Sequence, residues 1–256
     1  MKHRSFQLNT IKNIAASARG IFALAVFALI SGCAAGPHPR DPFEPFNRNV
    51  SQFNQDVDRV FLRPVATTYQ AVTPAPVRSS VRNFFVNITE PWSFANNLVQ
   101  FKIQDAAETL MRFSINTVFG VFGFFDVAGD AGIDRHRQDF GQTLARYGVG
   151  TGPYLVLPVL GPSTMRDTIT LPLVWKADLL PWVGDEGGRN ALYVLRVVDT
   201  RANLLRAGAV LDQAALDPYS FQRDIFLQLR DNERSRAGKY DEDAGDLPPL
   251  PEPDKP

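Results

Sequence analysis

A repeating apolar pattern runs from Phe43 to Phe61, FEPFNRNVSQFNQDVDRVF, and decides how the folded part of the chain begins. Its hydrophobic residues recur every three or four positions, at Phe43, Phe46, Val50, Phe53, Val57, Val60 and Phe61. Residues three and four apart lie on one face of an α-helix, so this spacing predicts an amphipathic helix with its polar residues on the other side. Arg63 and Pro64 follow, and because the residue before a proline disfavours helical backbone, we expect the helix to end there.

The same helical spacing recurs along most of the chain. It predicts further helices over 75–88, from about residue 91, over 103–118 and over 187–211. One strand-like run, YLVLPVL at 154–160, is interrupted by Pro158, so we expect an extended connection there rather than a sheet. The predicted fold class is therefore all-α, with little or no sheet.

The first 32 residues have the pattern of a secretory signal. They carry four bases, no acid and an apolar run at 21–30, which is too short to span a bilayer as a helix. Ile30, Ser31 and Gly32 precede Cys33 in a sequence that resembles a bacterial lipobox, so we expect Cys33 to become the acylated first residue. The alternative is an ordinary signal followed by an incidental cysteine.

The remaining chain divides by composition into three parts. Residues 33–40 are rich in glycine and proline and are expected to form a tether, in which Ala34, by resemblance to enterobacterial sorting rules, implies delivery to the outer membrane. Residues 41–237 form the expected helical domain. Residues 238–256 hold five prolines and six acids, a composition that cannot build a core and predicts a disordered tail.

Composition and motifs argue against several classes of function. With 27 basic and 27 acidic residues, the chain lacks the basic excess of a nucleic-acid-binding protein. A single cysteine forms no intrachain disulfide and no cysteine metal cluster. The glycines of YGVGTGPYLVLPVLGP at 147–162 match no nucleotide-binding pattern, and a lipid hydrolase would need His136 to act with Ser163 without any hydrolase motif. We therefore predict no catalytic residue, no metal and no cofactor, and no enzymatic activity.

Eight consecutive apolar residues, VFGVFGFF, occupy Val118 to Phe125. Two glycines inside this run weaken a regular helix by about 1 kcal/mol each, so we expect a bend or a close backbone contact. One interpretation is a buried helix pair with tight glycine contacts. The other is an apolar hairpin that lines a path for acyl chains or dips into a bilayer. The candidate residues are Val118, Phe119, Gly120, Val121, Phe122, Gly123, Phe124, Phe125, Asp126 and Gly129.

Ordered sequence blocks resemble the VacJ/MlaA lipoproteins of Gram-negative outer membranes. The blocks are DPFEPFNR at 41–48, RPVA at 63–66, NTVFG at 116–120, FDVAG at 125–129, DFGQTL at 139–144 and YGVGTGPY at 147–154. Shorter matches continue to DPY at 217–219, so the resemblance covers about 41–229 and excludes the acidic tail.

The resemblance implies a single ring-like bundle of amphipathic helices with a central channel, held by its lipid anchor on the periplasmic side of the outer membrane. It implies that phospholipids that stray into the outer leaflet pass through the ring to a periplasmic lipid-carrier protein, which maintains lipid asymmetry. Trimeric porins are further partners that it implies, and the apolar hairpin corresponds to residues 118–129. The alternative function is a porin-associated structural lipoprotein without transport activity.

Overall fold

The computed structural model describes residues 38–243 and, within them, every side chain except those of residues 210–214 and 233–243. The expected signal, Cys33 and most of the tether therefore lie outside the described residues. In chain order the elements are α2 (Glu44–Val57), the π-helical η1 (Asp58–Leu62), α3 (Arg63–Val72), α4 (Ala75–Asn87), α5 (Glu90–Val99), α6 (Ile103–Val118), α7 (Val127–Asp130), α8 (Phe140–Arg146), β1 (Tyr154–Leu157), β2 (Gly161–Thr164), α9 (Met165–Ala177), the 3-10 helix η2 (Leu180–Trp182), α10 (Glu186–Ala214) and α11 (Pro218–Asp243).

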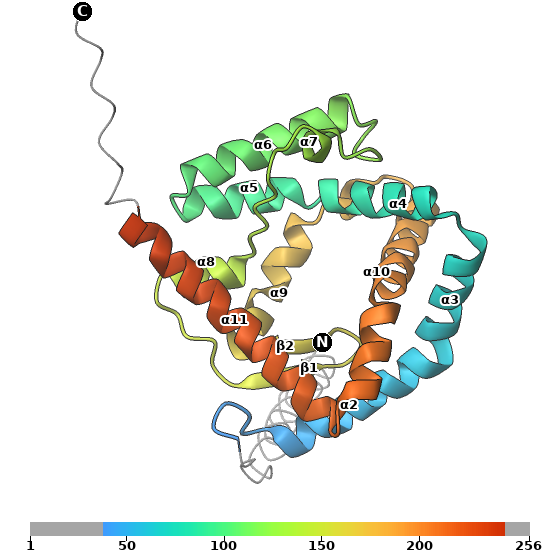
Figure 1. The fold of residues 1–256 in the computed structure, drawn as a ribbon, viewed down its shortest axis with the longest axis vertical. Coiled ribbons are helices and arrows are strands. Elements are labelled where there is room, and N and C mark those ends of the chain that lie inside the picture. Colours follow the sequence, from blue (N-terminus) through green and yellow to red (C-terminus); the bar gives the residue numbers. More distant parts are fainter. Residues whose placement is uncertain (1–37, 244–256) are drawn as a thin grey trace, which may run out of the picture.

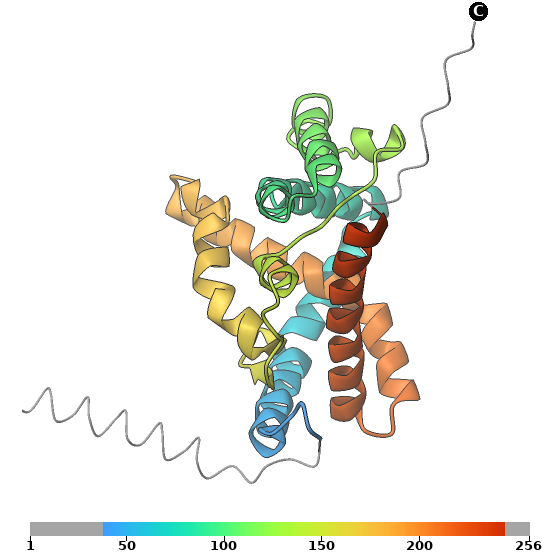
Figure 2. The ribbon, with the colours of Figure 1, turned by 90° about the vertical axis from the view of Figure 1, so that its left-hand side faces the viewer.

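These elements form a ring (Figure 1). In that view α4 and α5 run along the upper side of the opening, α9 on the left, α10 on the right and the β1–β2 hairpin below, while α6 and α7 lie beyond α5. From the side, α9 and α11 lie on opposite faces of the ring (Figure 2). The all-α prediction and the ring that the resemblance implied are both confirmed.

The first helix does not end at Pro64, so that prediction is wrong. The chain continues through η1 into α3, in which Pro64 occupies the first turn. A proline inside a regular helix removes one hydrogen bond and clashes with the carbonyl four residues earlier. The π-helical turn relieves this conflict. In it the backbone N–H of Arg63 donates to the carbonyl of Asp58, five residues back, so the helical hydrogen bonds have already shifted by one residue before Pro64.

The segment at 154–160 is also more regular than predicted. Strand β1 pairs antiparallel with β2, in a register that places Tyr154 opposite Thr164 and Leu157 opposite Gly161. Pro158 lies in the three-residue tip between the strands, where its missing N–H removes no ladder bond. The expectation of an extended connection instead of a sheet is therefore wrong over these residues.

Two asparagines of α2 hold this hairpin by its free edge. The side-chain amide of Asn47 donates to the carbonyl of Tyr154 at 3.0 Å, and its oxygen accepts from the N–H of Val156 at 2.9 Å. Two turns further along α2, on the same face, Asn54 donates to the carbonyl of Leu157 and accepts from the N–H of Val159. The two amides thus make the backbone hydrogen bonds that a third strand would make, and the position of α2 fixes that of the hairpin.

The sequence pattern did not single out α3, α8, α9 or α11. The last of these runs to Asp243, so residues 238–243 of the expected disordered tail are helical. Residues 244–256 lie outside the described part of the chain.

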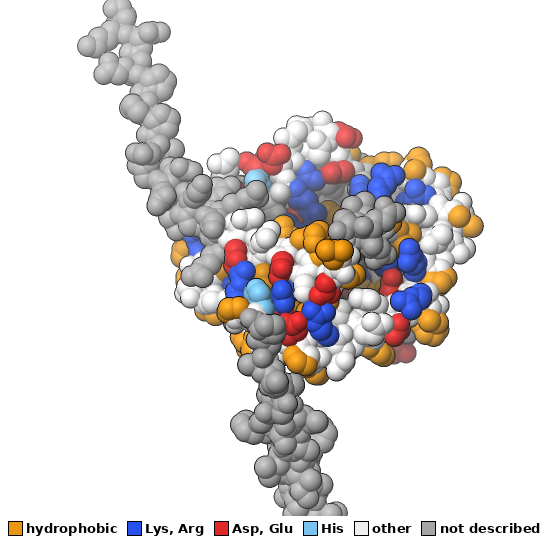
Figure 3. Space-filling view, turned by 60° about the horizontal axis from the view of Figure 1, so that its bottom comes forward, with side chains coloured by type: hydrophobic (Ala, Val, Ile, Leu, Met, Phe, Trp, Pro, Cys, Tyr) orange, Lys and Arg blue, Asp and Glu red, His pale blue; other side chains and the backbone are white. Residues whose placement is uncertain are grey.

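Burial in the described residues is reversed relative to a water-soluble protein. Fully buried positions are more often polar than apolar, and the buried side chains of Asn96, Asn97, Gln100, Thr109 and Thr143 join α5, α6 and α8 through hydrogen bonds of 2.7 to 3.3 Å. Large apolar side chains are instead exposed along most helices. One face of the molecule shows charged side chains of both signs, with hydrophobic ones both among them and along the edge (Figure 3). Exposed apolar surface on this scale marks an interaction surface.

We expect Asn47→Ala to lower the free energy of unfolding by about 3 kcal/mol, because the buried carbonyl of Tyr154 and N–H of Val156 would lose their partner. Asn49→Ala on the same helix removes an exposed amide and is expected to change it by less than about 0.5 kcal/mol. Urea unfolding of the detergent-solubilised protein, followed by circular dichroism, measures both. Equal values for the two variants would contradict the docking role of Asn47.

Candidate functional site

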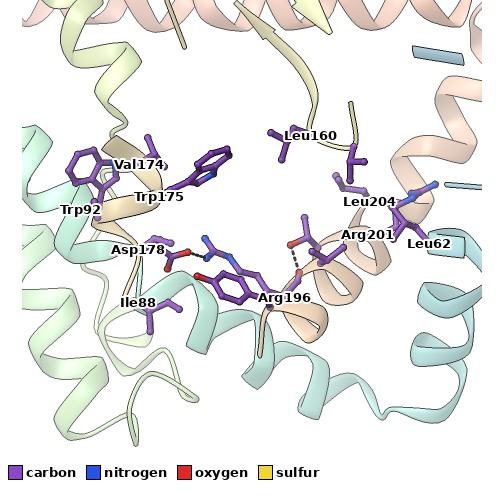
Figure 4. A pocket seen from close by; sticks show the side chains of 16 residues that line it. Leu62, Ile88, Trp92, Leu160, Val174, Trp175, Asp178, Arg196, Arg201 and Leu204 are labelled. Carbon is purple, nitrogen blue, oxygen red and sulfur yellow. Dashed lines mark hydrogen bonds and ion pairs between the residues drawn. The ribbon is translucent and has the colours of Figure 1, made fainter. Parts of the chain in front are cut away.

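A cavity of about 560 Å³ opens within the ring. Figure 4 shows its walls, which come from the end of η1, the α4–α5 junction, the hairpin tip, α9 and α10. The lining residues are Leu62, Ile88, Thr89, Trp92, Val159, Leu160, Val174, Trp175, Ala177, Asp178, Tyr193, Arg196, Val197, Thr200, Arg201 and Leu204. These residues are spread over most of the sequence and meet only in the folded ring.

Most of this wall is apolar and open. Trp175 is 59% exposed and Leu160 57%, although both line the cavity. Both side chains point into the space between α9 and the hairpin in Figure 4. The cavity therefore offers aromatic and aliphatic surface to a ligand instead of burying it in a core, as apolar binding sites do.

A polar stripe along α10 interrupts the apolar wall. Arg196 donates to the carboxylate of Asp178 at 2.8 Å, and Arg201 donates twice to Asp58, at 2.5 and 2.7 Å. Thr200 lies between these two pairs on the same helix. Each arginine is matched by a carboxylate, so the stripe is polar without carrying a large net charge. The whole site is amphipathic and suits a ligand with both apolar and polar parts.

The hairpin tip that enters this cavity is conformationally strained. Val159 has a φ of +66°, and a β-branched residue in the left-handed region costs about 1–2 kcal/mol. The bond from its N–H to Asn54, 2.7 Å long, holds the tip in that conformation. Strain of this kind persists where the surrounding structure enforces it, often at functional sites.

The apolar run at 118–125 lies elsewhere. None of its residues is among those that line the cavity; Val118 ends α6, and residues 119–125 form a series of tight turns between α6 and α7. Phe119, Phe122 and Phe125 are each more than half exposed, so the interpretation as a buried helix pair is wrong. The part of that interpretation that concerned tight glycine contacts holds, since a Cβ on Gly120 or Gly123 would come within 2.5 Å of neighbouring atoms.

This run, residues 118–125, is a rigid protrusion, and we call it the apolar loop. Val121 and Phe122 both have positive φ, and Gly123 follows with a φ of +91°. Backbone N–H groups of Phe122 and Gly123 donate to the last turn of α6, at 2.9 and 2.8 Å. The loop therefore presents its aromatic side chains from a fixed backbone.

Asp126 fastens the end of this loop. Its carboxylate caps α7 by accepting from the N–H of Gly129, and it accepts further bonds from Asn116 and from the buried Arg112. Burial alone would raise the pKa of this carboxyl, but the hydrogen bonds from Asn116, Gly129 and Arg112 outweigh it and lower the pKa. The structure thus gives Asp126 and Gly129 a role in holding the loop.

The residues considered for hydrolysis are not brought together in the cavity. His136 bonds to Glu108 at 2.6 Å, while Ser163 in β2 bonds to Thr168, and neither lines the cavity. Among the described residues, no group of three or more His, Cys, Asp or Glu side chains is arranged to hold a metal ion. None of the described helices combines the length and apolar content that crossing a membrane requires.

Comparisons with known proteins agree on one family. A family model described as MlaA lipoprotein matches residues 39–233. An uncharacterized protein of Rickettsia bellii (strain RML369-C) is 38% identical over 204 residues, covering 79% of this chain and 78% of that protein. The intermembrane phospholipid transport system lipoprotein MlaA of Escherichia coli (strain K12) is 34% identical over 221 residues, covering 79% and 83%. A solved structure, described as the structural basis for maintenance of bacterial outer membrane lipid asymmetry, matches with a TM-score of 0.66 at 34% identity, over 76% of this chain and 98% of that one.

We expect Val159→Asn to raise the free energy of unfolding by about 1 kcal/mol, because asparagine tolerates the left-handed conformation of the tip. The thermal unfolding midpoint should rise by roughly 2–4 °C. Val149→Asn is the matched control, since Val149 is also exposed but has an ordinary φ, and it should give no rise. A fall in the midpoint for the Val159 variant would argue against strain at the tip.

Proposed function

The chain belongs to the MlaA lipoprotein family, and we propose that its ring is a passage for phospholipids. In this proposal, phospholipids leave the outer leaflet of the outer membrane through the cavity and pass to a soluble periplasmic carrier, so that the outer leaflet keeps its own lipid composition. The observation that carries the proposal is the amphipathic cavity, with apolar side chains such as Trp175 facing open space beside the ion-paired stripe of α10.

The physical task explains why such a cavity is useful. A diacyl phospholipid that leaves a bilayer for water exposes about 30 methylenes, which costs on the order of 20 kcal/mol at about 0.8 kcal/mol each. Free desorption is therefore very slow. An apolar wall that replaces the bilayer around the acyl chains, with a polar stripe beside it for the head group, lowers this barrier, and no covalent bond needs to be made or broken.

The exterior of the ring supports a position within the membrane surface. Exposed apolar side chains occur on the outer helices and on the apolar loop, where they would contact acyl chains. Acylation of Cys33 would tether the chain, since more than one acyl chain gives stable anchoring. We propose that the ring lies in the inner leaflet of the outer membrane, on its periplasmic side, with the apolar loop inserted among acyl chains.

A trimeric porin and a periplasmic lipid-carrier protein complete the proposal as partners. A structural lipoprotein that binds a porin without passing lipid is the alternative, and it assigns no role to an open apolar cavity. The two functions differ in a reconstituted system, because a scaffold would bind the porin and yet transfer no lipid to a carrier.

We expect Val197→Trp to reduce lipid transfer by about tenfold, the effect of about 1.4 kcal/mol of added barrier. Val197 lines the cavity, so the larger indole side chain of tryptophan there would narrow the passage. The measurement is transfer of fluorescent phospholipid from proteoliposomes to the purified carrier.

Val194→Trp is the matched control, because Val194 is exposed on the same helix and does not line the cavity. It is expected to leave transfer unchanged. Equal transfer by both variants, or no transfer by the unaltered protein, would refute the passage. Gene deletion offers a second readout, since unchanged surface phospholipid in the deletion strain would also contradict it.

We expect Phe119→Asp combined with Phe122→Asp to weaken membrane binding, because two charges would replace exposed aromatic rings in the apolar loop. Vesicle co-sedimentation of the Cys33→Ser protein removes the contribution of the lipid anchor. Asn49→Asp combined with Gln52→Asp adds the same charge to the exposed polar face of α2 and serves as control. Equal binding of the two double variants would place the loop outside the bilayer.

A further inference from the structure

Two side chains of opposite charge face the cavity where the end of α9 approaches α10. Arg196 donates from Nη1 to the carboxylate of Asp178 at 2.8 Å, and both residues line the cavity (Figure 4). Asp178 directly follows α9, and its other carboxylate oxygen accepts from the N–H of Leu180 at 3.2 Å. The side chain of Arg196 is 32% exposed and that of Asp178 19%, so a ligand in the cavity can reach both charges.

This ion pair leaves hydrogen-bonding capacity unused. A guanidinium group has five N–H donors, and within the described part of the chain the side chain of Arg196 donates only to Asp178. Arginine matches two phosphate oxygens at once, so its remaining donors suit a phosphodiester. Each carboxylate oxygen has about two acceptor sites, so Asp178 can also accept from an ammonium group. The pair therefore presents a donor side and an acceptor side to the same ligand.

An aromatic residue accompanies each member of the pair. Trp175 precedes Asp178 by three residues, and Tyr193 precedes Arg196 by three, a spacing that makes side chains neighbours on a helix. Both aromatic residues line the cavity, and Trp175 is 59% exposed. The face of an aromatic ring attracts a cation, most strongly when the ring is an indole. Trp175 therefore adds to the attraction of Asp178 for an ammonium group.

The charges around the cavity balance. Its charged lining residues are Arg196, Arg201 and Asp178. Asp58 accepts two hydrogen bonds from Arg201, so two positive charges stand against two negative ones and the sum is two minus two, or 0. An anion that enters such an apolar site loses hydration and finds no excess of positive charge. A zwitterion loses hydration too, but each of its charges meets an opposite one, so the balance favours a neutral ligand with a strong dipole.

We propose that the Arg196–Asp178 pair selects a zwitterionic phospholipid. Arg196 binds the phosphate of the head group, and Asp178 together with Trp175 binds its ammonium group. The ion pair stays intact, since the two head-group charges lie alongside the two protein charges in the opposite order. Further along α10, Val197 and Leu204 line the cavity and contact the acyl chains. This inference rests on the proposed function and adds a head-group preference to it.

Equilibrium binding to the full-length protein in detergent at low salt tests this preference. The labelled probes are dihexanoyl phosphatidylethanolamine, which is zwitterionic, dihexanoyl phosphatidylglycerol, which is anionic, and dihexanoylglycerol, which has no charged head group. We expect the zwitterionic lipid to bind at least about tenfold more tightly than the anionic one. Equal binding of the two phospholipids, or tighter binding of the anionic one, would overturn the proposal.

Two single substitutions should shift this ratio of affinities in opposite directions. Asp178→Asn keeps an oxygen for the N–H of Leu180 but removes the negative charge, so the anionic lipid should gain and the tenfold preference should disappear. Arg196→Gln removes the positive charge, so the anionic lipid should lose more than the zwitterionic one and the ratio should rise by about threefold. Glu186→Gln is the matched control, because Glu186 is an exposed partner of Arg189 on the same helix and does not line the cavity. It should leave the ratio unchanged, and a ratio that moves the same way in both cavity variants would contradict the two roles.

The outcomes separate this inference from the proposed function. If the three probes bind equally well and lipid transfer persists, the head-group preference is wrong and the passage stands. If the unaltered protein binds none of them, the cavity is no lipid site, and both proposals fail. Diacylglycerol binding by each variant shows that its cavity is folded. The ratio measured with the unaltered protein tests the preference even where a variant does not fold.

Discussion

The ring depends on the buried carboxylate of Asp41, around which the start of α2 and the start of α11 meet. Asp41 is 0% exposed, and its oxygens accept from Asn47 at 2.8 Å, from the hydroxyl of Tyr219 at 2.5 Å and from Arg223 at 3.4 Å. An unpaired buried carboxylate is costly by several kcal/mol, so these partners must stay in place. Since Asn47 belongs to α2 and the other two to α11, one charge joins the first and last helices.

The position of this junction determines the shape of the cavity. Asn47 also docks β1, and Asn54, two turns further along α2, holds the hairpin tip. The tip then carries Val159 and Leu160 into the cavity opposite α9 and α10. A shift of α2 would therefore move the hairpin and change the width of the opening, even though α2 itself contributes nothing to the wall of the cavity.

The sequence predicts those helices that have one apolar face. The bounds of α6 agree with the expected range, and α4 differs from it by one residue. The apolar stripe gave the correct period for α6 but not its buried face, because the buried residues of that helix are mainly polar, among them Asp105, Thr109 and Arg112. Helix α9 was not predicted, because its apolar residues lie on several sides and leave no clear stripe. Val174 and Trp175 face the cavity, while Ile169 does not line it and is 70% exposed. The apolar loop was visible as a continuous run, but the cavity residues extend from Leu62 to Leu204 and share no local pattern. Only the fold brings them together.

The lining of the cavity suits the proposed passage for lipid. A site that moves lipid must bind it well enough to admit it and weakly enough to release it, as ion pathways do. Trp175 and Leu160 give apolar contact without enclosing the ligand, because both remain more than half exposed. The pairs Arg196–Asp178 and Arg201–Asp58 give hydrogen-bonding capacity without an uncompensated charge that would hold a phosphate tightly along the whole path.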